Sequence, residues 1–112
     1  MSVIIYHNPR CSKSRQTLEL IKEKGIEPVI VDYLENPPGV MEIRNILKML
    51  DKKPIEVIRK KEAKEEGVDL EDDDMSLMKA MAANPRIIER PIVCKGDKAV
   101  LGRPPENVHD LL

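Results

Sequence analysis

Residues 3–25 read VIIYHNPRCSKSRQTLELIKEKG, and their pattern predicts the first strand, turn and helix of the fold. Its first four residues, Val3 to Tyr6, form an apolar run typical of a short buried strand. The polar segment HNPRCSKSR (residues 7–15) follows, and its Asn-Pro pair is typical of a turn. We therefore predict a strand that leads into a turn holding Cys11.

A helix is predicted directly after this turn. Leu18 and Ile21 lie on one face at helical spacing, Ser12 or Ser14 could cap the start, and Gly25 would end it.

A second strand is predicted from the run Val29-Ile30-Val31 with Tyr33 and Leu34, closed by Asn36-Pro37-Pro38-Gly39. Because a helix separates the two strands, they should be parallel and joined by a right-handed connection.

The middle of the chain is predicted to be helical and charged. Helical spacing is present before the break that Pro54 imposes, at Val40, Ile43, Ile46, Leu47 and Leu50. The charged runs 60–66 and 71–74 read as solvated surface. Asp74 is expected to cap a helix that ends before Pro85 and buries its methionines as core residues, at Met75, Met78 and Met81.

The end of the chain predicts a hairpin and a last helix. Ile92–Cys94 and Ala99–Leu101 flank a two-residue turn at Gly96-Asp97, and Pro104-Pro105 would begin the helix. This order predicts an α/β, thioredoxin-like fold: a mixed four-stranded sheet with an inserted helical region over about 39–89, in a single domain of residues 1–112.

Charge and cysteine content exclude several classes of protein. With 19 Lys and Arg against 20 Asp and Glu, binding to nucleic acid by bulk electrostatics is not expected. No apolar run approaches a membrane span, so we expect a cytoplasmic protein. Cys11 and Cys94 fit neither a disulfide framework nor zinc-ligand spacing, so two free thiols and no metal are expected.

Cys11 is the candidate nucleophile, because a thiolate is stabilised at the start of a helix. Arg10, Lys13 and Arg15 add positive charge beside it. The pKa of its thiol should therefore lie below the free value of about 8.5. The same placement could bind an oxyanion, but a cysteine in such a loop can also be inert.

Spacing argues against three related chemistries. A phosphatase loop would need arginine where Thr17 stands, and a dithiol motif would need cysteine in place of Ser14. A hydrolase would need a base and an orienting carboxylate that no motif supplies. His7 could act on the thiolate or could be a structural hydrogen-bond partner.

The chain resembles the glutaredoxin-coupled arsenate reductase (ArsC-like) family, particularly its short YfgD-type members. The resemblance rests on HNPRCSKSR and the later pieces YLENPP, VIRKKE, ERPIV and LGRPPE, which occur in order over nearly the whole chain. It implies a thioredoxin-like fold in which the proline of Arg90-Pro91 is cis.

The resemblance also implies the roles of individual residues. Cys11 would attack arsenate, and three arginines would hold the oxyanion: Arg59, Arg90 and Arg103. His7 and Ser14 would tune the thiolate. The resemblance assigns no role to Arg15, which, like Arg10 and Lys13, could be solvated, support the anion field or touch the substrate. Glutathione would be a co-substrate and glutaredoxin a partner, with no tightly bound cofactor.

Two other functions stay open on the sequence alone. One is a glutathione-dependent thiol oxidoreductase with another substrate. The other is an Spx-like regulator that binds RNA polymerase, although such regulators carry Cys-x-x-Cys where this chain has Ser14.

Overall fold

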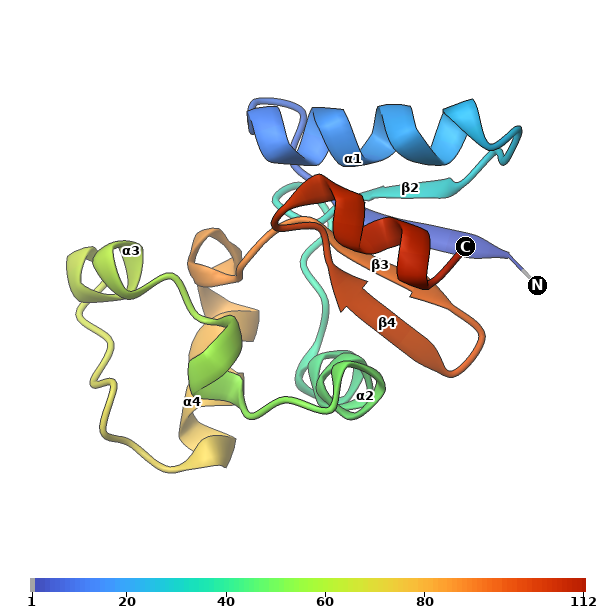
Figure 1. The fold of residues 1–112 in the computed structure, drawn as a ribbon. Coiled ribbons are helices and arrows are strands. Elements are labelled where there is room, and N and C mark those ends of the chain that lie inside the picture. The colour runs from blue at the N-terminus through green and yellow to red at the C-terminus, as the bar shows by residue number, and fades with distance from the viewer. Residues whose placement is uncertain (1) are drawn as a thin grey trace. The chain divides into compact units, whose positions relative to one another are not determined.

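The computed structural model describes residues 2–112, which form two compact units (Figure 1). One contains the chain up to Asn36 together with Arg90–Leu112, and the other contains Pro37–Glu89. The second unit nearly coincides with the helical insertion predicted over about 39–89. That residues 1–112 form a single domain stays a prediction.

The first unit is a four-stranded sheet with two helical segments. Its elements are β1 (Val3–His7), α1 (Ser12–Glu23), β2 (Val29–Asp32), β3 (Ile92–Lys95), β4 (Lys98–Leu101) and the 3-10 helix η3 (Pro105–Asp110). The strand order is β2-β1-β3-β4. β1 runs parallel to β2 and antiparallel to β3, with Ile5 opposite Ile30 and Val93. The predicted thioredoxin-like mixed sheet is confirmed.

An aliphatic core fixes α1 against the sheet. Alternate residues of β1 are buried, which is the two-residue period of a strand with one face inward. Val3 and Ile5 pack with Val93 of β3, Ile21 of α1 and Val108 of η3. Figure 1 shows α1 and η3 side by side over the sheet. This packing holds the start of α1, and therefore Cys11, at the end of β1.

The predicted caps of α1 were wrong. Cys11 itself is the N-cap residue, and within residues 2–112 no side chain makes a capping hydrogen bond there. Ser14 lies inside the helix and is fully buried. The helix does end at the predicted place: Gly25 has φ +75° and its N–H donates to the Lys22 carbonyl, a conformation that favours glycine.

β2 is shorter than predicted, since Tyr33 and Leu34 follow it in a turn. The Asp32 carboxylate accepts the N–H of Leu34 at 3.2 Å, and the Asp32 carbonyl accepts the N–H of Asn36 at 2.9 Å. Such local hydrogen bonds compete with the sheet and end the strand.

The second unit is helical. Its elements are α2 (Val40–Leu50), the 3-10 helix η1 (Pro54–Val57), α3 (Lys60–Glu65), α4 (Asp74–Ala83) and the 3-10 helix η2 (Pro85–Ile87). α2 and the break at Pro54 are as predicted. The charged run 60–66 was expected only to be solvated surface, but it forms the short helix α3, in which Ala63 alone is buried.

The cap of α4 lies one residue earlier than predicted. Asp73, not Asp74, accepts the N–H of Ser76, at 2.8 Å. Met78 and Met81 are buried as predicted, but Met75 is 43% exposed because the first turn of α4 faces solvent.

The C-terminal predictions are confirmed. β3 and β4 form an antiparallel hairpin around Gly96-Asp97, and the helical segment after Pro104 is η3, of the 3-10 type. In the described part of the chain, no helix is long and apolar enough to cross a membrane.

Candidate active site

Cys11 stands at the junction of β1 and α1, where a short turn fixes its backbone. Its N–H donates to the Asn8 carbonyl at 3.0 Å, and the Asn8 side chain accepts the N–H of Arg10 at 3.0 Å. Asn8 is buried, whereas Cys11 is half-buried. The thiol is therefore held rigidly and still reachable from solvent.

The surroundings of Cys11 favour its thiolate. Burial by itself raises the pKa of the thiol, but the Ser14 N–H, the Arg90 side chain and the Lys13 N–H outweigh it, so that the pKa lies below its ordinary value. These N–H groups belong to the first turn of α1, where backbone N–H groups have no partner within the helix. Neither makes a capping bond of full geometry to the sulfur, so their effect is that of oriented dipoles.

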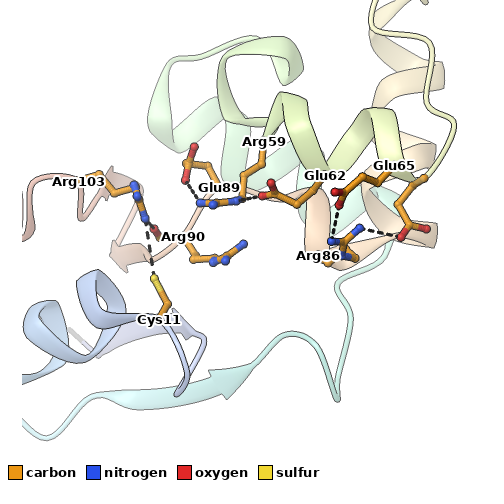
Figure 2. Close-up of polar contacts among 9 residues, drawn as sticks. Cys11, Arg59, Glu62, Glu65, Arg86, Glu89, Arg90 and Arg103 are labelled. Carbon is orange, nitrogen blue, oxygen red and sulfur yellow. Dashed lines mark hydrogen bonds and ion pairs between the residues drawn. The ribbon is translucent and has the colours of Figure 1, made fainter.

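Two arginines of the first unit lie at the sulfur. Arg103 Nη1 is 3.9 Å from Cys11 Sγ and donates to the Arg90 carbonyl at 3.1 Å (Figure 2). The Arg103 contact is long, and of the two arginines it is Arg90 that lowers the pKa of the thiol, after the larger effect of the Ser14 N–H. The peptide bond Arg90-Pro91 is cis, as the family resemblance implied, and so is Arg103-Pro104.

His7 and Ser14 form a buried pair beside the thiol. His7 Nδ1 and Ser14 Oγ are 2.6 Å apart, and the same hydroxyl accepts the N–H of Asn8 at 3.1 Å. Burial lowers the pKa of His7, with smaller contributions from Asp32, which raises it, and Arg15, which lowers it. The pair joins the end of β1 to the first turn of α1.

The exposed cations of the segment lie differently from the two site arginines. Arg10, Lys13 and Arg15 are exposed, and the Arg15 guanidinium donates to the Pro9 carbonyl at 3.0 Å. Lys13 acts on the thiol mainly through its backbone N–H. Arg15 thus supports the turn, and direct contact of any of the three with a substrate is not indicated.

Arg59 belongs to the second unit and is held by two carboxylates. It precedes α3, and its guanidinium pairs with Glu62 and, at 3.0 Å, with Glu89 (Figure 2). Burial lowers the pKa of Arg59, but the two carboxylates raise it by more than burial lowers it. The guanidinium therefore keeps its charge. Its role at Cys11 stays a prediction.

Three residues that the sequence did not single out for a role lie behind the site. Thr17 and Gly102 are buried against each other, and the Asn107 amide donates to the carbonyls of Leu101 and Arg103. The sequence signal for this packing is Gly102, which lies between the predicted strand and Arg103, but a glycine at such a position has several explanations.

Chemically, the site offers a half-buried thiolate with guanidinium groups beside it. This combination suits attack on a tetrahedral oxyanion, since guanidinium groups bind such anions and stay charged at neutral pH. Among residues 2–112, no three His, Cys, Asp or Glu side chains gather as a metal site would require.

The comparisons with known proteins agree with this geometry. The ArsC family profile matches residues 6–111. The chain is 47% identical to an arsenate reductase of Haemophilus influenzae over 100% of both chains. It is 47% identical to the uncharacterized protein YfgD of Escherichia coli K12, over 98% of this chain and 96% of that one. The solved arsenate reductase from Vibrio cholerae has a TM-score of 0.90 and 42% identity, over 100% of this chain and 98% of that one. The chain belongs to the ArsC family.

Proposed function

We propose that this protein is an arsenate reductase that uses the Cys11 thiolate as its nucleophile. The observation that carries the proposal is the position of Cys11 at the open start of α1, with the Arg90 side chain lowering its pKa and Arg103 3.9 Å away. Relatives of the same family that are named arsenate reductase match the whole chain.

Arg90 and Arg103 are proposed to bind the arsenate oxygens. Guanidinium groups next to the nucleophile place the arsenic within reach of sulfur and neutralise the charge of the anion, which otherwise repels a thiolate. Arg59 is proposed as the third arginine, as the family resemblance implies. His7 and Ser14 are proposed to stabilise the junction of β1 and α1, which carries Cys11.

The reaction is proposed to run in two stages. The Cys11 sulfur forms a bond to arsenic(V), and one arsenate oxygen leaves as water after taking up protons. A glutathione thiol then attacks the Cys11 sulfur, and the sulfur–arsenic bond breaks with its electron pair left on arsenic. Arsenic(V) is thereby reduced to arsenite, and the two sulfurs are oxidised to a Cys11–glutathione disulfide.

Glutaredoxin is proposed to close the cycle by attacking the glutathione sulfur of this disulfide, which releases the Cys11 thiolate. An external reductant is favoured because Cys94, the other cysteine, lies in β3 with only 4% of its surface exposed. A cytoplasmic location would supply glutathione in its reduced form.

The test is arsenate reduction by the purified chain with glutathione and glutaredoxin. We expect turnover by the wild type, none by Cys11→Ser, and most of the activity in Cys94→Ala, the matched control. Retained arsenate turnover by Cys11→Ser would contradict the proposed mechanism. If the wild type reduced a mixed disulfide but not arsenate, the chain would be a thiol oxidoreductase with another substrate.

A further inference from the structure

Gly102 lies where two other segments leave no room for a side chain. A Cβ atom at this position would lie 2.5 Å from Thr17 Oγ1 and 2.8 Å from Pro91 Cγ. Real Cβ atoms do not approach other atoms this closely, so glycine allows the backbone of residue 102 to pack directly on Thr17 and Pro91. We refer to this packing as the Gly102 contact.

The Gly102 contact joins the three segments that carry the site. Thr17 is on α1, whose N-cap is Cys11; Pro91 follows Arg90; and Gly102 precedes Arg103. A hydrogen bond reinforces the packing, since the Gly102 N–H donates to the Pro91 carbonyl at 2.9 Å. The Thr17 hydroxyl is 2.8 Å from the Lys13 carbonyl, within its own helix, and 3.4 Å from the Gly102 carbonyl.

Asn107 holds the same turn from its other side. Its amide nitrogen donates to the Leu101 carbonyl at 3.2 Å and to the Arg103 carbonyl at 3.1 Å, one on each side of Gly102. Arg103 in turn donates to the Arg90 carbonyl at 3.1 Å. The backbone around Arg103 is therefore fixed on both sides of Gly102, and this fixes where the Arg103 guanidinium lies relative to the sulfur.

We propose that Gly102 and Asn107 are positioning residues. Through the Gly102 contact and the Asn107 hydrogen bonds, they set the distance from the Arg90 and Arg103 guanidinium groups to the Cys11 sulfur. The inference rests on the proposed function for its effect on arsenate, but its effect on the thiol does not depend on any substrate. The Arg103 contact, at 3.9 Å, is already long. A shift of a few tenths of an ångström between α1 and the turn would therefore weaken it.

The first test is Gly102→Ala in a Cys94→Ala background, with Gly39→Ala as the matched control. Gly39 has φ −76° and an added Cβ there meets nothing within 4 Å. We expect Gly102→Ala to raise the pH inflection of Cys11 alkylation, because Arg90 moves relative to the sulfur. We also expect kcat/KM for arsenate to fall about 10- to 100-fold, the range typical of a misplaced catalytic group. Gly39→Ala should change neither.

A second-site variant separates positioning from general damage. Thr17→Ala removes Oγ1 and Cγ2, the two Thr17 atoms nearest the added Cβ, at 2.5 and 3.0 Å. Combining Gly102→Ala with Thr17→Ala should bring the alkylation inflection part of the way back to the wild-type value and restore part of the lost activity. A double variant no better than Gly102→Ala alone would overturn the proposal.

Asn107→Ala covers the case in which Gly102→Ala does not fold. It leaves the packing untouched and removes both hydrogen bonds to the turn, so the alkylation inflection should again rise. An unchanged inflection and unchanged arsenate kinetics in a folded Asn107→Ala or Gly102→Ala protein would overturn the inference. If the wild type failed to reduce arsenate while the inflections moved as expected, the proposed function would fall and the positioning role would stand.

Discussion

Ser14→Ala removes one oxygen atom from the interior of the first unit. The Ser14 hydroxyl is fully buried, lies 2.6 Å from His7 Nδ1 and accepts the Asn8 N–H at 3.1 Å. Asn8 and His7 are each only 7% exposed, so neither polar group can readily turn to water when the hydroxyl is lost. The substitution leaves a buried donor and a buried ring nitrogen without a partner.

The magnitude follows from these two groups. A buried polar group left unsatisfied costs about 1–3 kcal/mol, and such costs do not simply add, so Ser14→Ala should lower the free energy of unfolding by roughly 2–4 kcal/mol. For a chain of this size the melting temperature should fall by roughly 10 °C. The Ser14 N–H, which helps to lower the pKa of Cys11, is retained. The inflection of Cys11 alkylation should therefore stay close to the wild-type value.

Urea denaturation at pH 7.5 measures the first expectation, with Ser12→Ala as the matched control. Ser12 is the exposed first residue of α1, and its substitution should stay within about 0.5 kcal/mol of wild type. If Ser14→Ala were no more destabilising than Ser12→Ala, the hydrogen bonds of the buried pair would not support the fold. If the alkylation inflection rose as well, the buried pair would also tune the thiolate, as the family resemblance implies.

Three further predictions concern single side chains. Because burial lowers the pKa of His7, the unfolded chain binds a proton more readily than the folded chain, and the free energy of unfolding should fall as the pH drops below about 6.5. His7→Gln should reduce this dependence of stability on pH, as measured by urea denaturation at several pH values. Arg90→Ala should raise the alkylation inflection of Cys11, whereas Arg15→Ala should leave it nearly unchanged; equal shifts would mean that general positive charge, not the placement of Arg90, lowers the pKa. Cys11→Ser should stabilise the fold by about 0.5–1 kcal/mol at pH 6, because serine caps helices better than a thiol; a less stable variant in the same urea assay would contradict this.

Most of the fold was predictable because its signals are local. A run of β-branched residues, a helical period and a two-residue turn each depend on a few neighbouring residues, and β1, α2 and the hairpin were found in this way. α3 was missed for the same reason. Its residues 60–65 are nearly all charged and show no apolar period, and only Ala63 is buried in the structure.

The parts of the site that depend on distant residues were less accessible. The Gly102 contact joins residues 85 apart in the chain, and no local pattern marks it. The source of the low pKa of Cys11 was also only partly anticipated. The start of the helix was expected to lower it, and two backbone N–H groups there do so. The side chains of the neighbouring Arg10, Lys13 and Arg15 were also expected to lower it, but the guanidinium that does so is that of Arg90, which is distant in sequence.

The wrong prediction of the α1 cap has a chemical reason. Ser14 could not cap the helix, because its hydroxyl is already engaged by His7 and Asn8 in the interior. A serine or aspartate at position 11 would have bonded the first N–H groups of the helix and satisfied them. A thiol is a weak hydrogen-bond acceptor until it loses its proton, so with Cys11 as N-cap these N–H groups favour the thiolate instead. The helix gives up a normal cap, and the negative charge at Cys11 is stabilised by the donors left open.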